Sequence, residues 1–131
     1  MFTLSLDEEE ALARHRRETM EVEFVMQAVR DQGGASVATL DDAALEREVQ
    51  ATLDCCERLG LTSDADRLTL CLLEFLAVPG LRDLPQLPEI FAQAGGAPDA
   101  RLHAVFAFLP FQVWAHLTEQ AETVRRARGW T

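Results

Sequence analysis

The sequence predicts an all-α fold, a single-domain bundle of five to six helices over residues 1–131. Helix start signals precede segments in which apolar residues recur every three or four positions, and glycine or proline follows these segments. The most apolar segment, residues 68–80, holds few β-branched residues, which favours helix over strand. The chain is 48% hydrophobic and 26% charged, as in an ordinary globular domain.

The first helix is expected from Leu6 to Asp31. Ser5 and Glu8 have the spacing of a capping box, and the glycines at 33–34 are expected to end the helix. Its apolar residues form a rough stripe that is expected to pack: Leu12, Met20, Phe24, Val25, Ala28 and Val29. The opposite side is charged and is expected to face water: Arg14, Arg17, Glu18 and Glu21.

The second helix is expected from Thr39, which begins a start signal, to Gly60. Its apolar residues recur at helical spacing and predict a buried face: Leu45, Val49, Leu53, Cys56 and Leu59. Gly60 suits the left-handed conformation that often follows a helix C-terminus, and Leu61 can fold back against the last turn.

The third helix is expected from Ser63, a second capping residue, to Val78 before the Pro-Gly pair at 79–80. Apolar residues cover most of its circumference, so we expect it in the middle of the bundle. This run is too short to span a bilayer, which needs about 20 apolar residues. The last third predicts a short helix at 88–94 and a helical stretch at 99–128 that Pro110 breaks or kinks.

Glu74 interrupts the apolar third helix. No acid or histidine lies three or four residues away, so it has no local partner for acid–base catalysis. We therefore expect Glu74 to be the one wet position of this helix, or to pair with Arg82 or Arg101, without a catalytic role.

The formal net charge is −10, and residues 1–60 hold −8 of it. Such a surface repels phosphate backbones, so direct nucleic-acid binding is not expected. It steers basic proteins toward the chain. All basic residues are arginine, a bias expected of a bacterial protein with GC-rich codons. The first residues lack the pattern of an export signal, which predicts a cytoplasmic location without membrane insertion.

We identify no catalytic, cofactor-binding or metal-binding residue. Cys55, Cys56 and Cys71 lack the spacing of a zinc site and are expected to be reduced and mostly buried. His15, His103 and His116 stand alone. The sequence contains no nucleotide-binding or hydrolase motif, so an enzyme is not expected.

Two surfaces are candidates for binding a protein. One is the acidic N-terminal region, where charge reversal of Glu18, Glu21 and Glu23 is expected to weaken binding. The other is the proline-broken aromatic segment at 106–117, which offers Phe111 and Trp114 as anchors; the alternative is that both complete the core. Trp130 is expected to be hard to bury and is a further candidate contact.

The segments "LDDAALEREV" and "ERLGLTSDADRLTLCLLEFLAVPGLRDLPQLPEIFA", within residues 40–92, resemble small helical proteins encoded beside type VI secretion spike and effector genes of Gram-negative bacteria. The shared pattern is an amphipathic helix, a glycine turn, an apolar helix and a proline-containing loop before a short helix. The resemblance implies a cytoplasmic adaptor, chaperone or immunity protein that binds a secreted effector.

The leading hypothesis is therefore a non-enzymatic protein-binding module whose partner is a basic toxin or effector. One alternative is an acidic mimic of nucleic acid, with carboxylates in a regular double row. Another is a small helical enzyme or ligand-binding protein, with Glu74 beside His103 or His116 in a pocket. A homodimer also remains open.

Overall fold

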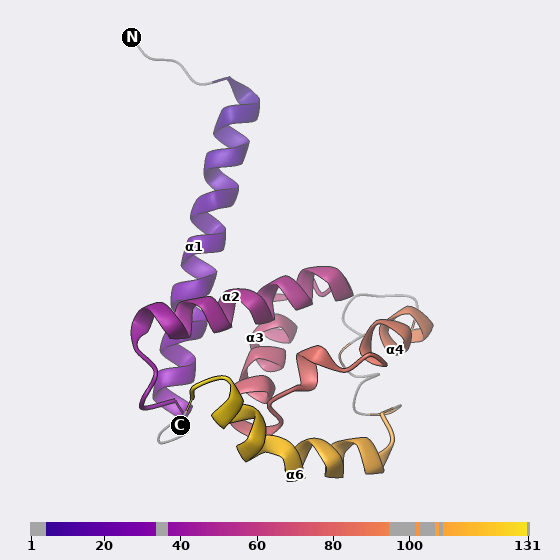
Figure 1. Ribbon diagram of the computed structural model, residues 1–131. Helices are drawn as coiled ribbons and strands as arrows, with labels where there is room; N and C mark the ends of the chain where they lie inside the picture. The colour runs from indigo at the N-terminus through magenta and orange to yellow at the C-terminus, as the bar shows by residue number, and fades with distance from the viewer. Residues whose placement is uncertain (1–4, 34–36, 95–101, 103–106, 108, 131) are drawn as a thin grey trace.

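The computed structural model describes residues 5–33, 37–94, 102, 107 and 109–130, and every regular element within them is helical (Figure 1). The α-helices are α1 (Leu6–Gly33), α2 (Asp42–Leu59), α3 (Asp64–Leu72), α4 (Leu87–Ala94) and α6 (Phe111–Ala127). A π-helix (Leu73–Ala77) continues α3, and a 3₁₀-helix (Leu81–Asp83) follows. The all-α prediction is confirmed. The predicted helical stretch between Asp99 and Pro110 lies mostly outside the described residues.

The long helix α1 stands out from the body of the molecule. Its C-terminal part packs against α2 and α3, while its N-terminal part extends into solvent (Figure 1). Ser5 caps it as predicted, accepting a hydrogen bond from the Glu8 amide at 3.2 Å. The buried residues of α1 are Val22, Val25 and Val29.

The predicted apolar stripe of α1 is wrong in its first half. Leu12, Met20 and Phe24 are exposed, at 43%, 68% and 63%. Residues two apart on an α-helix point to nearly opposite sides, so Met20 cannot share the core-facing side of Val22. The first buried residue of α1 is Val22, and no described part of the chain covers the residues before it.

Helix α2 has the predicted buried face, and its end is also confirmed. Gly60 adopts a φ of 75°, and the amide of Leu61 donates to the Cys56 carbonyl at 3.0 Å. This hydrogen bond and the left-handed conformation of Gly60 end the helix in a Schellman motif. The start differs from the prediction: Asp41 is the cap and accepts from the Ala44 amide, whereas the hydroxyl of Thr39 donates to the Trp130 carbonyl.

The third predicted helix is confirmed, with a change of winding that the sequence did not indicate. Ser63 caps α3, and the final turn widens into the π-helix, where the Val78 amide donates to the Leu73 carbonyl at 2.8 Å. The neighbouring residues Glu74 and Phe75 lie in this wider turn, and both are fully buried.

Two adjoining apolar clusters form the core. One contains residues of α2, α3, α4 and α6, and the other contains residues of α1, α2, α3 and the π-helix together with Trp130. Cys56 lies in the first cluster and Cys71 in the second. Among the described helices, none combines the length and the apolar character that a membrane span needs.

Candidate functional site

A hollow of about 370 Å³ lies between α1 and α2, close to the point where α1 leaves the body. Carboxylates from both helices surround it: Glu18 and Glu23 on α1, and Glu46 on α2. Val22 and Met26 supply apolar surface to the same hollow. All three carboxylates are exposed, and none forms an ion pair within the described part of the chain. We call these five residues the acidic hollow.

A broader groove of about 970 Å³ also borders α1, and Arg67 forms ion pairs with two of the acids that line it. The guanidinium of Arg67 donates to both carboxylate oxygens of Glu21 at 2.8 Å and to Glu57 at 2.8 Å. The hydrogen bonds that Arg67 donates to Glu21 raise the pKa of Arg67 above its usual range. Glu21 therefore connects α1 to α3 through an ion pair, unlike Glu18 and Glu23.

The aromatic candidates lie in three different environments. Phe111, at the start of α6, is 80% exposed and remains available to a partner. Trp114 is half-buried and packs against the first core cluster. Trp130 is fully buried and stacks on Phe75, with ring centroids 4.9 Å apart. The expectation that Trp130 is a surface contact is therefore wrong, because its ring is buried in the second core cluster and stacks on Phe75.

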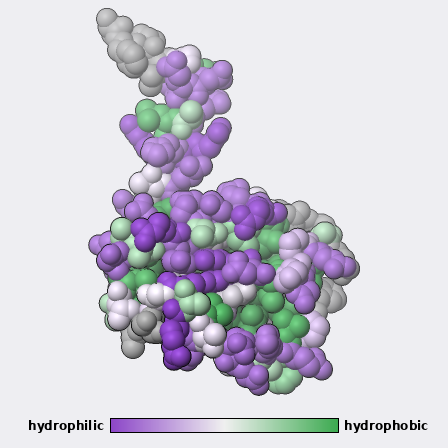
Figure 2. Space-filling view, viewed as in Figure 1, coloured by the Kyte–Doolittle hydropathy of each residue, from purple (hydrophilic) through white to green (hydrophobic). Residues whose placement is uncertain are grey.

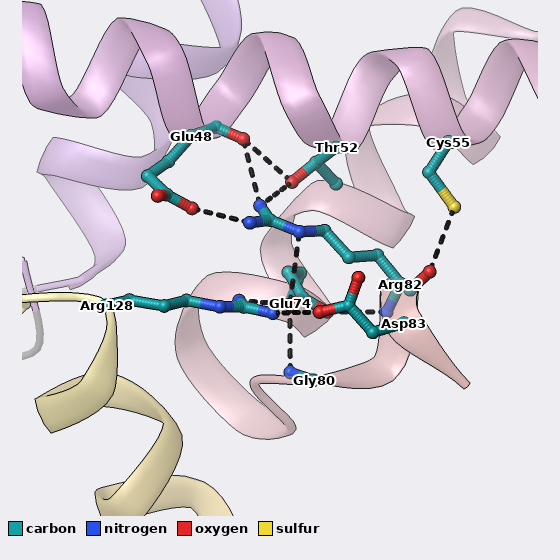
Figure 3. A network of polar contacts seen from close by, with 8 residues as sticks. All are labelled: Glu48, Thr52, Cys55, Glu74, Gly80, Arg82, Asp83 and Arg128. Carbon is teal, nitrogen blue, oxygen red and sulfur yellow. Dashed lines mark hydrogen bonds and ion pairs between the residues drawn. The ribbon is translucent and has the colours of Figure 1, made fainter.

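Glu74 lies at the centre of a buried polar network (Figure 3). Its carboxylate accepts hydrogen bonds from the amides of Gly80 and Arg82, both at 2.9 Å, and from the guanidinium of Arg128 at 2.5 Å. The Arg82 Nε lies 3.9 Å from the same carboxylate. The predicted pairing of Glu74 with Arg82 is confirmed. The prediction that Glu74 is exposed to water is wrong, because its side chain is fully buried. Arg101 lies outside the described residues.

The two arginines connect Glu74 to the rest of the network. Arg82 donates to Glu48 at 2.7 Å and to the Thr52 hydroxyl at 2.9 Å, both on α2, and Arg128 donates to Asp83 at 2.7 Å (Figure 3). The network thus joins α2, the π-helix, the following turn and the end of α6. Three hydrogen bonds and the nearby Arg82 guanidinium therefore engage both oxygens of Glu74 within the protein.

The described histidines do not complete an acid–base pair with Glu74. His116 is exposed on α6 and His15 borders the acidic hollow, while His103 lies outside the described residues. Within the described part of the chain, no group of three or more His, Cys, Asp or Glu side chains is arranged to hold a metal ion. Of the two histidines named for the small-enzyme alternative, only His116 lies in the described part of the chain, and it is not among the hydrogen-bond partners of Glu74 there.

The three cysteines are buried free thiols, as expected from the sequence. Burial raises the pKa of Cys55 to about 11, and neighbouring Cys56 acts in the same direction. The hydrogen bond with Cys56, followed by burial, raises the pKa of Cys71. The Cys55 thiol also donates to the Arg82 carbonyl at 3.6 Å, next to the polar network.

We expect the free energy of unfolding to fall as the pH rises from about 9 to 11. The unfolded thiol ionises near pH 9 while the folded one stays protonated, so the unfolded chain binds fewer protons and is favoured. The Cys55 shift alone corresponds to about 2 to 3 kcal/mol. The chain has neither lysine nor tyrosine, so cysteine is the side chain that titrates in this window.

Denaturant unfolding at several pH values measures this loss. Cys55→Ala removes one titrating thiol and is expected to flatten the decline between pH 9 and 11, compared with its own value at pH 8. An equally steep decline in this variant would contradict a role for Cys55.

Sequence reasoning missed Glu46 and Arg128 as important residues. Glu46 is one of several acids on the polar side of α2, and only the crossing of α1 brings it beside Glu23. Arg128 follows the last helix, and its partner Glu74 is 54 residues away in the sequence. Comparisons of this chain with protein families, curated proteins and solved structures gave no match.

Proposed function

We propose that this chain is a non-enzymatic protein-binding module that holds a basic segment of its partner in the acidic hollow. The observation that carries the proposal is the set of three unpaired carboxylates, Glu18, Glu23 and Glu46, that two helices place around one hollow. The charged residues of the buried network are engaged with one another, so the acidic hollow is the stronger candidate.

The hollow suits an arginine or lysine side chain of a partner. The apolar surface of Val22 and Met26 fits the methylene stem, and the carboxylates fit the cationic head. The net charge of −10 adds long-range attraction, which raises the association rate at low ionic strength. Interactions of this kind weaken as salt screens the charges.

We further propose that the partner is a secreted bacterial effector or toxin and that the chain acts in the cytoplasm as its adaptor, chaperone or immunity protein. This step rests on the resemblance of residues 40–92 to proteins encoded beside type VI secretion genes. All three roles require binding without catalysis, and they differ in what the partner does afterwards.

Acidic and basic segments alternate along α1, and this pattern favours the proposal over a mimic of nucleic acid. The acids at 7–10 are followed by Arg14, Arg16 and Arg17 before the acids resume at Glu18. A row of phosphate-like charges would not contain a block of three arginines on the same helix.

The test is affinity purification from the native bacterium at low and moderate salt, with partners identified by mass spectrometry. We expect a stoichiometric basic partner that the wild-type chain retains at low salt and loses as salt rises. The amount of partner recovered with the variant Glu23→Arg/Glu46→Arg should be at least about tenfold lower than with the wild type, because two attractive contacts become repulsive.

The matched control is Glu89→Arg/Glu119→Arg, which makes the same change of net charge at exposed positions of α4 and α6. This variant is expected to retain the partner. Equal retention by both variants would overturn the assignment of the acidic hollow, and a failure to recover any partner at either salt would count against the binding function itself.

A further inference from the structure

The N-terminal half of α1 has a surface that nothing in the described chain covers. Every side chain from residue 5 to residue 20 is exposed, and the helix stands free of the body (Figure 1). Figure 2 shows this projection as largely hydrophilic, with hydrophobic side chains interrupting the surface partway along it. An isolated helix of this length is only marginally stable in water, because most helix stability comes from packing.

Three apolar residues form a line along this projection. Leu6, Ala13 and Met20 are spaced seven residues apart, close to two full turns, so they lie on one side of the helix. Leu6 is 71% exposed and Met20 is 68% exposed. The seam between two packed helices repeats every seven residues, and here one position of each repeat is apolar while the intervening position is charged.

The charges beside this line are symmetric about Ala13. Glu9 and Glu10 lie four and three residues before it, and Arg16 and Arg17 lie three and four residues after it. None of these four side chains has an ion-pair partner within the described part of the chain. The segment is therefore complementary to itself when it is reversed.

We propose that two copies of this chain associate through antiparallel pairing of their α1 projections, with a two-fold axis at Ala13. In this register Leu6 of each copy lies against Met20 of the other, and the two Ala13 residues meet at the axis. Glu9 faces Arg17, and Glu10 faces Arg16. A parallel pair would instead place like charges together, which is destabilising.

This pairing leaves the acidic hollow open. Val22 points to nearly the opposite side of α1 from Met20, because the two residues are two positions apart. The contact is isologous and closes at two copies, as a two-fold interface must. The dimer would present two acidic hollows, and its formation does not depend on the partner proposed above.

The first test measures mass in solution by sedimentation over a range of concentrations. We expect the wild-type mass to rise from 14.6 kDa toward twice that value. The variants Glu9→Arg/Glu10→Arg and Arg16→Glu/Arg17→Glu should each weaken self-association by at least about tenfold, because four ion pairs become repulsive. An equimolar mixture of the two variants restores every opposite-charge pair and should regain the dimer.

The second test determines direction by disulfide formation under oxidising conditions. Leu6→Cys and Met20→Cys are mixed, and we expect a crosslinked dimer in the mixture but little in either variant alone. Crosslinking within each variant alone would indicate a parallel pair and overturn the proposed register.

Wild-type protein that keeps the single-chain mass at every concentration would overturn the dimer. All substituted positions are exposed, so helix content and thermal unfolding should match the wild type and confirm that the variants fold. The monomeric charge variants retain Glu23 and Glu46, and their capture of the basic partner separates a failure of dimerisation from a failure of the proposed function.

Discussion

Replacing Glu74 with alanine is expected to destabilise the protein by about 3 to 5 kcal/mol, because it leaves buried charges without their partner. Arg128 would lose its buried carboxylate, and the amides of Gly80 and Arg82 would lose their acceptor. A domain of this size has a total stability of about 5 to 15 kcal/mol. The variant should therefore unfold at much lower denaturant concentration, with an unchanged transition slope.

The control for this experiment is Glu119→Ala. Glu119 is exposed on α6 and is in none of the ion pairs of the described residues, so its removal should change stability by less than about 0.5 kcal/mol. Glu74→Gln keeps one acceptor oxygen and should fall between the two. A Glu74→Ala variant within about 1 kcal/mol of the wild type would show that the network contributes little net stability.

Replacing Trp130 with alanine is expected to have a comparable effect, about 3 to 5 kcal/mol, through loss of a large buried side chain and the cavity that remains. The indole is fully buried against Phe75, and the Arg128 guanidinium lies 5.2 Å from its ring centroid. Its removal therefore weakens the second core cluster and the polar network together. Thermal unfolding followed by circular dichroism measures the loss.

Phe111→Ala is the matched aromatic control. Phe111 is 80% exposed and should change the unfolding free energy by less than about 0.5 kcal/mol. Fluorescence adds a second readout in a Trp114→Phe background, where Trp130 is the remaining tryptophan. A red-shifted, quencher-accessible emission in the native state would contradict the enclosed position of Trp130.

The features that were predictable from the sequence depend on neighbours along the chain. The cap at Ser63 and the left-handed Gly60 involve partners within about five residues, so local spacing was sufficient to predict them. The buried face of α2 could also be predicted from the helical spacing of its apolar residues, because this helix packs along most of its length.

The features that were missed depend on distant partners. The spacing of apolar residues along α1 could not reveal that the rest of the molecule covers only the second half of this helix, so Met20 and Phe24 were expected in the core. The burial of Glu74 depends on Arg128, and that of Trp130 depends on Phe75; both pairs are more than 50 residues apart. Composition and spacing cannot show which distant arginine meets a given carboxylate.

The long reach of these contacts has a consequence for synthesis on the ribosome. Glu74 and Phe75 emerge well before Arg128 and Trp130, so a growing chain exposes an unpaired carboxylate and an open apolar surface until residue 130 is released. The native body can therefore close only after synthesis has passed this point, although α2 and α3 can form earlier. Contacts of such sequence separation slow folding, and the unfinished intermediate is the state most prone to aggregation or to capture by a chaperone.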